Sequence, residues 1–360
     1  MNKAGLITDP GSPAMSVLCN LLDGGSAELD ETGAWPEKQL QHCAQAGVYR
    51  WFLGAEQGGY GWDEPDLMRG YLKLSAVCMT TAFVLTQATG ALRRIADSAT
   101  NEVQGDLLDD LLAGNAFTTL GISHLTTSRR HLARPALRAT QSTEGFLLNG
   151  FSPWVTGGPF ADFVVIGAQL DDDRQLLAIL PRELPGVSAD QPSRLVALNG
   201  SQTGAVRLDQ VALDRRWLLA GPELDVMQGA TGAKTGGLQT SALAIGLADR
   251  AVEFLEQESR QRKELAGPAE RLRAEQLLLQ QDLLSLAAGG QPCSREQLRG
   301  SANSLALRSS QATLAAAKGT GYVQGHPAGR WCREAMFFLV WSCPQAVMEA
   351  NLCELAGISD

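Results

Sequence analysis

The sequence predicts an α+β fold of three parts, with a helical region at each end and a small β-layer between them. Apolar residues recur at helical spacing up to about residue 116 and again after about residue 223. Short β-branched runs separated by turns occupy the interval. We therefore expect an N-terminal helical domain (1–116), a middle domain that is a small antiparallel β-barrel or sandwich (117–222), and a C-terminal antiparallel four-helix bundle (223–360).

The N-terminal part contains apolar segments with helical periodicity. Pro36 suits the first turn of a helix, because its φ is fixed near the helical value and its missing N–H is not needed there. The glycine-rich run Glu56 to Gly61 separates the first two segments from the others. The predicted helices are Met15 to Leu22, Pro36 to Ala46, one or two buried helices within Leu67 to Ile95, and Glu102 to Leu112.

The middle part is organised around residues Leu147 to Gly158. Asn149-Gly150 lies between apolar runs and predicts a tight hairpin, since this dipeptide tolerates positive φ. Trp154 and Thr156 are two apart, so on a strand they share one face and present an indole plane beside a hydroxyl. Such a face suits a flat aromatic ligand, and ordinary sheet packing is the alternative interpretation. Further strands are expected at Phe117 to Ser123, Leu137 to Gln141, Ala161 to Ile166, Leu176 to Leu180, and Gly204 to Leu208.

The C-terminal part is rich in leucine and alanine. Gly267-Pro268, Gly289-Gly290 and Gly319-Thr320-Gly321 break it into long amphipathic segments, whose lengths suit an antiparallel bundle. The predicted helices are Leu238 to Arg262, Ala269 to Ala288, Ser294 to Lys318, Trp331 to Trp341, and Gln345 to Ala356.

The composition argues against several partners. The formal net charge of -9 and the pI near 5.1, without a basic cluster, do not fit a nucleic-acid-binding protein. Seven cysteines without a Cys-x-x-Cys pair fit reduced thiols and give no metal site. No segment reaches the length of a membrane span or of a signal sequence. We therefore expect a soluble cytoplasmic protein.

Several short segments occur in a particular order. Glu56-Gln57-Gly58-Gly59-Tyr60-Gly61 is followed by Leu148-Asn149-Gly150 and by Trp154-Val155-Thr156-Gly157-Gly158. The later segments are Gly246-Leu247-Ala248-Asp249-Arg250-Ala251, Arg262-Lys263, Gly319-Thr320-Gly321-Tyr322 with Pro327, and Arg333-Glu334-Ala335. In order and spacing, from about residue 50 to the C-terminus, this series resembles the acyl-CoA dehydrogenase family of flavoproteins.

The resemblance implies bound FAD between the β-domain and the bundle. It also implies a homodimer or homotetramer, in which a second subunit reaches part of the nucleotide. It places Trp154 against the flavin ring, Thr156 near the reactive nitrogen, Ser123 at the pyrimidine edge, Arg262 on the pyrophosphate and Gly319 close to it. An aromatic plane, short hydroxyls and a guanidinium suit these roles.

The resemblance is weaker around the pyrophosphate. Glu264, Leu265 and Ala315 stand where the family has a small polar residue, a phenylalanine and a glutamine. A carboxylate at position 264 would repel the pyrophosphate unless Arg262 or Lys263 screens it. Tight FAD binding therefore depends on how Glu264 is paired.

The substrate-facing half departs further from the family. The family's base, which removes the α-proton, is usually a carboxylate in a Tyr-Glu-Gly-Thr turn, and here Ser342 occupies that position within Trp341-Ser342-Cys343-Pro344. A serine hydroxyl cannot do this work unaided. Lys234 and Gly237 stand where the family has the Asp and Arg that hold the substrate's thioester tail and adenine end. The catalytic residue is therefore unassigned.

Other side chains are candidates for missing parts of the site, although plain interpretations exist for each. His124 and His131 lie near the predicted flavin face, and both are also ordinary loop histidines. Cys343 is expected to be an inert thiol. The remaining candidates are Glu334, Glu349 and Glu354 as a base under a shifted alignment, His326 in a connecting loop, and Arg129-Arg130 against a phosphate-bearing substrate such as an acyl-CoA.

The resulting expectation is an FAD-dependent oxidoreductase of the acyl-CoA dehydrogenase type. It would act on the CH–CH group of an acyl thioester or a related substrate. Two alternatives stay open: a flavin-dependent monooxygenase of the same fold, and a binding or scaffold homologue without catalysis.

Overall fold

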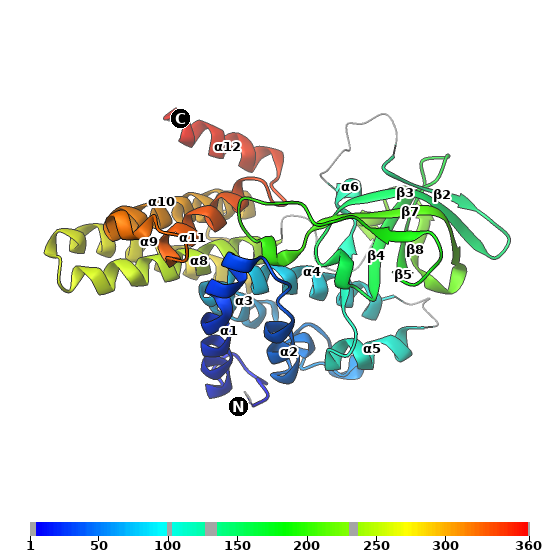
Figure 1. The fold of residues 1–360 in the computed structure, drawn as a ribbon, viewed down its shortest axis with the longest axis horizontal. Coiled ribbons are helices and arrows are strands. Elements are labelled where there is room, and N and C mark those ends of the chain that lie inside the picture. The colour runs from blue at the N-terminus through cyan, green and yellow to red at the C-terminus, as the bar shows by residue number, and fades with distance from the viewer. Residues whose placement is uncertain (1–4, 99–102, 127–134, 230–236, 359–360) are drawn as a thin grey trace.

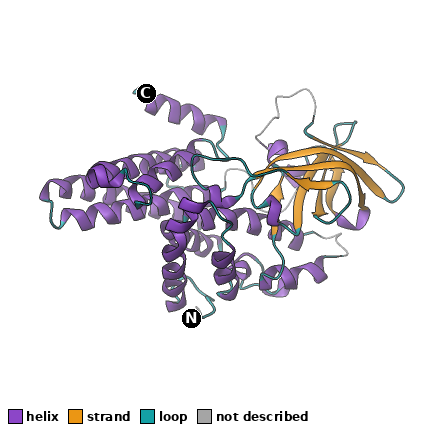
Figure 2. Cartoon of the chain, in the orientation of Figure 1, coloured by secondary structure: helices purple, strands orange, loops and turns teal. Residues whose placement is uncertain are grey.

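The computed structural model describes residues 5–98, 103–126, 135–229 and 237–358, and its chain passes from helices through a sheet back to helices (Figures 1 and 2). The first helix, α1, is capped by Ser12, whose Oγ accepts from the Ala14 N–H at 3.3 Å, and it ends at Gly33 with φ 63°. It is longer than predicted because it continues through Gly24 and Gly25. The N-terminal helices are α1 (Pro13–Thr32), α2 (Glu37–Gln45), α3 (Glu64–Val77), α4 (Met79–Ala96) and α5 (Gln104–Ala113).

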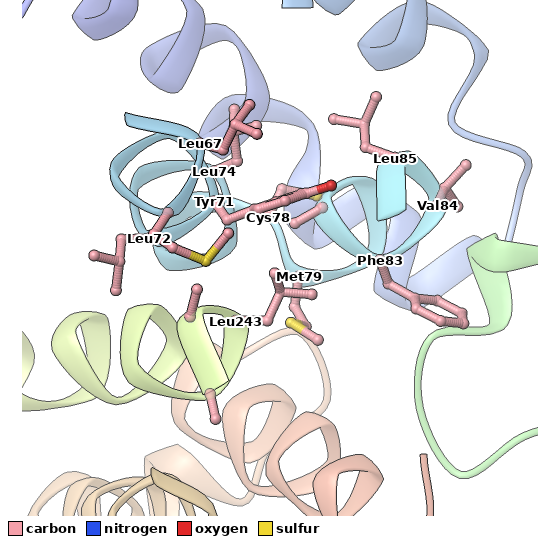
Figure 3. Packing of buried hydrophobic residues seen from close by; sticks show 14 of the residues in the cluster. Leu67, Tyr71, Leu72, Leu74, Cys78, Met79, Phe83, Val84, Leu85 and Leu243 are labelled. Carbon is pink, nitrogen blue, oxygen red and sulfur yellow. The ribbon is translucent and has the colours of Figure 1, made fainter. Parts of the chain in front are cut away.

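The apolar region from Leu67 to Ile95 forms two helices. Cys78 has extended backbone, with φ -152° and ψ 96°, and separates α3 from α4. Both helices are rich in buried residues, and α3 packs against α8 (Leu238–Ser259) of the C-terminal part. Figure 3 shows Tyr71, Met79 and Leu243 in this shared core. The two helical regions thus bury one apolar cluster in common.

The middle part is an eight-stranded mixed sheet. Its order is β6-β7-β3-β2-β4-β5-β8, with β1 paired to β4. Most pairs are antiparallel as predicted, but β1 with β4 and β2 with β4 are parallel. The prediction of a purely antiparallel layer was therefore wrong at these two pairs. The strands are β1 (Thr118–Gly121), β2 (Leu137–Gln141), β3 (Gly145–Val155), β4 (Phe163–Gln169), β5 (Gln175–Pro181), β6 (Val187–Ala189), β7 (Gly204–Asp214) and β8 (Leu218–Glu223).

Strands β4 and β5 are buried on both faces. Val165 and Ile179 belong to the core shared with the helices, whereas their neighbours Val164, Ile166 and Leu180 belong to a second cluster on the other side of the sheet. Successive side chains of a strand point to opposite faces. This explains why these strands are continuous apolar runs without alternating polar residues.

The predicted hairpin at Asn149-Gly150 is wrong. Both residues lie inside β3, where the register against β7 shifts between Leu148 and Gly150. Asn149 Oδ1 accepts from the backbone N–H of Gln210 at 2.9 Å, and Gly150 has φ 124°. Asp209 and Gln210 of β7 together oppose Asn149, so a β-bulge on β7, with Gln210 at φ 51°, lies where the hairpin was expected.

Apart from the single-turn helix α7 (Val226–Gly229), the described residues of the C-terminal part form three long helices and two shorter ones. The helix predicted from Trp331 to Trp341 ends earlier, at Met336, and a 3-10 turn, η7 (Phe337–Leu339), follows it. No helix among the described residues is both long and apolar enough to span a bilayer. The helices are α8, α9 (Ala266–Ala287), α10 (Arg295–Gly321), α11 (Pro327–Met336) and α12 (Gln345–Leu355).

Candidate functional site

The C-terminal end of β3 exposes a large aromatic side chain. Trp154 is 49% exposed, although Pro153 and Val155 beside it are buried. Apolar rings of this size are usually covered in a folded chain. The exposed indole is therefore a surface available to a ligand or to another chain.

The sequence predicted that Thr156 shares a strand face with Trp154, and this prediction is wrong. Strand β3 ends at Val155, and Gly157 follows with φ 67° in a turn. Thr156 is only 3% exposed, and its Oγ1 lies 3.1 Å from Thr203 Oγ1. Only the indole is presented to solvent here, while the hydroxyl is held inside.

Ser123 lies close to this region through the packing of β1 on β3. It begins the short helix α6 (Ser123–Thr126) directly after β1, and β1 contacts β3. A Cβ at Gly121 would lie 3.0 Å from Ser152 Oγ, so the two strands approach closely. The hydroxyls of Thr118, Thr119 and Ser152 are buried without a hydrogen-bond partner among the described residues.

His124 is a buried neutral imidazole. Its Nε2 lies 2.7 Å from the Gly167 carbonyl oxygen, so Nε2 is assigned the proton and Nδ1 carries the lone pair. Burial lowers the pKa of His124, against the opposing effect of that hydrogen bond. The imidazole is thus a weaker base than in water.

Arg262 and Gly319 lie at the bundle, away from the sheet. Arg262 Nη1 donates to the Ala316 carbonyl at 2.6 Å, and its Nε donates to Glu264 at 3.3 Å. The pKa of Glu264 is lowered, first by its own backbone N–H and then by Arg262 and Lys318. Glu258 also lies 3.6 Å from Arg262 Nη1, so two carboxylates share this guanidinium.

The backbone before Gly319 is unusual. Lys318 has φ 55° and ψ -148° inside α10, a conformation that is essentially restricted to glycine. Gly319 itself is exposed, and no atom lies within 4 Å of the position its Cβ would occupy. The chain thus offers open backbone and a cation at this kink.

The sheet residues and the bundle residues do not meet in one chain. Trp154 belongs to the sheet, whereas Arg262 follows α8, and α8 to α10 extend away from the sheet (Figure 1). Ser123 and Trp154 therefore form one group, and Arg262 and Gly319 another. A single ligand that bridges both groups would need a second copy of the chain.

Ser342 occupies a tight turn between η7 and α12. Its φ is 46°, a left-handed value that is uncommon for a residue with a side chain. Trp341 stacks on Phe337 at 5.2 Å between ring centroids, and Phe83 of α4 meets both rings edge-on. Aromatic packing thus fixes the turn against α4.

Two buried polar residues of α10 hold the same turn, and the sequence analysis missed both. Arg299 Nη2 donates to the Trp341 carbonyl at 3.0 Å, and Asn303 Nδ2 donates to the Phe338 carbonyl at 3.2 Å. They are four residues apart, so they lie on one face of the helix. An Arg and an Asn at this spacing on an apolar face were the signal that could have revealed them.

The alternative acids lie outside the turn that carries Ser342. Glu334 is 4% exposed, 3.9 Å from Arg330, and burial raises its pKa to about 7. Glu349 and Glu354 are exposed on α12, bonded to Gln345 and Ser304 respectively. Burial raises the pKa of Cys343, which lies next to Ser342, although the charge of Arg299 acts in the opposite direction. His326 Nδ1 caps α11 by accepting from the Ala328 N–H at 3.2 Å. Arg129, Arg130, His131 and Lys234 lie outside the described residues.

Two hollows in the described surface contain no candidate residue. The described residues also hold no cluster of three potential metal ligands. The larger hollow, of about 580 Å³, is a groove between the N-terminal segment, α3, α8 and α9. Its lining is Pro10, Gly11, Asp66, Arg69, Leu72, Lys73, Asp249, Gln280 and Leu284.

Comparison with known proteins relates the chain to acyl-CoA dehydrogenases. No protein-family profile matches it. The probable acyl-CoA dehydrogenase YngJ of Bacillus subtilis is 22% identical over 257 residues, covering 70% of this chain and 67% of that protein. Benzylmalonyl-CoA dehydrogenase of Aromatoleum aromaticum is 24% identical over 271 residues, covering 71% and 68%.

Solved structures share the whole fold. Butyryl-CoA dehydrogenase from Megasphaera elsdenii superposes with a TM-score of 0.81 at 17% identity, over 96% of this chain and 98% of that one. KijD3 in complex with FMN and a dTDP-sugar superposes with a TM-score of 0.72 at 18% identity, over 100% and 98%. The chain therefore has the acyl-CoA dehydrogenase fold, and acyl-CoA dehydrogenases are among its distant sequence relatives.

Proposed function

We propose that the chain is a flavin-dependent oxidoreductase of the acyl-CoA dehydrogenase type that binds FAD. The exposed indole of Trp154 carries this proposal, because a large ring left half open at a strand end suits stacking against a flat ligand. The buried hydroxyls around β1 and β3 that lack partners among the described residues support a polar ligand nearby. FAD, when bound, supplies an acceptor for a hydride from a substrate carbon.

The chain's own residues would divide the work of holding this cofactor. Trp154 would cover one face of the ring, while Ser123 would orient its polar edge. Thr156, whose buried hydroxyl lies beside Thr203, would contact the ring only if that hydroxyl turned away from Thr203. The pyrophosphate would lie against Arg262 and the open backbone at Gly319 of a second subunit. Lys318 at the kink supports an anion there, whereas Arg262 would have to exchange its contacts with Glu258 and Glu264 for the pyrophosphate.

An oligomer is part of this proposal. The apolar side chains Met348, Leu352, Leu355 and Ile358 are 37%, 58%, 61% and 60% exposed along α12 and the residue just beyond its last turn. An exposed apolar stripe of this kind marks an interaction surface. A homodimer or homotetramer would cover it and would bring the two halves of the cofactor site together.

The substrate side of the site would work differently from that of related enzymes. Ser342 supplies a hydroxyl that cannot remove an α-proton near neutral pH, and the pKa of His124 is lowered. We therefore propose that simple saturated acyl-CoAs are poor substrates. The substrate would be an acyl thioester or related molecule whose C–H is acidified by a neighbouring group.

A flavin-dependent monooxygenase is the second candidate. It is favoured by the absence of a carboxylate from the turn Trp341 to Pro344 and by the fold shared with KijD3, which was solved with FMN. Such a reaction uses flavin without that base. Oxygen uptake with substrate would distinguish it from dehydrogenation.

The proposal is tested by the absorption spectrum of the purified protein with and without added FAD. The expected result is a bound flavin spectrum, followed by bleaching under nitrogen with at least one member of an acyl-CoA mixture. A colourless protein that takes up neither FAD nor FMN would refute both candidate functions. Bound flavin that no acyl-CoA and no oxygen-dependent reaction turns over would leave a binding homologue instead.

A further inference from the structure

Arg299 is a cation enclosed by the protein. It is 4% exposed, and it lies between α10 and the turn that carries Ser342. Its Nη2 donates to the carbonyls of Phe338 at 3.4 Å and Trp341 at 3.0 Å. The Phe338 ring lies 5.9 Å from the guanidinium carbon.

No acid compensates this charge among the described residues. Arg299 has no ion pair there, and the N–H groups on its Nε and Nη1 are buried without a hydrogen-bond partner. Asn303, fully buried one turn further on, leaves its Oδ1 without a partner as well. A buried, unpaired cation costs several kcal/mol, so such charges are normally paired. Burial accordingly lowers the pKa of Arg299 to about 10, against the opposing effect of Cys343.

Holding two carbonyls does not explain an arginine. Both bonds use the single atom Nη2, which a lysine or glutamine could replace. The facing turn, Trp341-Ser342-Cys343, contributes no negative charge, because Ser342 is neutral and burial raises the pKa of the Cys343 thiol. The positive charge and the free N–H groups therefore remain available to an anion of matching shape, for which guanidinium prefers a carboxylate.

We propose that Arg299 and Asn303, with the turn Trp341–Cys343, form a binding site for a carboxylate group. The carboxylate is either a small free anion or the far end of a substrate's acyl group, and the second source rests on the proposed function.

The first experiment uses acetate as the probe. The thermal unfolding midpoint is measured against acetate concentration, with sodium chloride keeping the ionic strength constant, for wild type, Arg299→Met and Asn303→Asp. Wild type should gain roughly 5 °C at an acetate concentration one hundred times the Kd. Arg299→Met should gain nothing. Asn303→Asp, which supplies an internal carboxylate, should unfold at a higher temperature than wild type without acetate and lose the response.

The second experiment separates the two sources. On the flavin-loaded protein, binding of glutaryl-CoA is compared with that of pentanoyl-CoA, which has the same chain length without the far carboxylate. A tenfold or greater preference for glutaryl-CoA that Arg299→Met abolishes assigns the site to the substrate. An acetate response without this preference assigns it to a free anion.

Equal acetate responses in wild type and Arg299→Met, or no response in either, would overturn the proposal. Asn303→Asp decides the matter if Arg299→Met fails to fold, because an unchanged acetate response in that variant contradicts the site. The acetate measurements need no flavin. They therefore remain readable if the proposed oxidoreductase function fails.

Discussion

Lys318 adopts a backbone conformation that a glycine would hold at lower cost. Its φ of 55° and ψ of -148° lie where a Cβ is crowded, and residues held in such regions cost about 1–3 kcal/mol. Lys318→Gly removes this strain. It also gives the unfolded chain more conformational freedom, which lowers the free energy of unfolding by about 0.5–1 kcal/mol. We expect a net gain of about 1 kcal/mol in the free energy of unfolding.

Lys318→Ala is the matched control for this prediction. It removes the same ammonium group, including its effect on Glu264, but it keeps the Cβ and therefore the strain. The difference between the two variants isolates the backbone term. Urea unfolding followed by circular dichroism should place the midpoint of Lys318→Gly above that of Lys318→Ala. A glycine variant that is equal to or less stable than the alanine variant would refute the argument.

Three further predictions concern other regions. Gly150→Ala should lower the free energy of unfolding by more than about 2 kcal/mol, because φ is 124° there and the new Cβ would lie 2.2 Å from a main-chain oxygen. A melting temperature within 1 °C of wild type, a margin of roughly half a kcal/mol, would contradict this. Burial raises the pKa of Glu334 to about 7, above its value in the unfolded chain, so its contribution to stability is present below about pH 4.5 and is lost as pH rises to 7. Relative to wild type, Glu334→Gln should therefore gain up to about 3 kcal/mol between pH 4.5 and 8, and parallel pH profiles would argue against this. Leu352→Glu with Leu355→Glu should reduce the oligomer seen by light scattering without lowering helicity, whereas an unchanged mass would show that the α12 stripe is not the interface.

Periodicity predicted the long elements well, because their signals are local. The helices α8, α9 and α10 match the apolar segments and glycine breaks of the sequence to within a few residues. Strands β1, β2, β4, β5 and β7 were found in the same way, whereas β6 and β8 were not predicted and β3 was predicted as a hairpin. The parallel pairing of β4 with β1 and β2 was not predicted, since it depends on contacts between segments that are distant in the sequence.

The errors at the site come from signals with two structural meanings. Asn149-Gly150 predicts a turn, but the positive φ of Gly150 lies inside β3, beside a bulge of β7. Trp154 and Thr156 have strand spacing, but the strand ends between them. For Arg299 the sequence offered only its spacing from Asn303, because its significance comes from burial and from the lack of an acid beside it among the described residues.

The proposed flavin site is tested most directly by titrating the apoprotein with FAD for wild type, Trp154→Phe and Trp154→Ala. Binding is monitored by flavin absorbance and fluorescence. Wild type should bind FAD. Trp154→Ala should raise the Kd about tenfold or more, since it removes the stacking plane, while Trp154→Phe keeps an aromatic ring and should stay close to wild type. If wild type binds no FAD, or if Trp154→Ala binds it as tightly as wild type, the proposed flavin site is wrong.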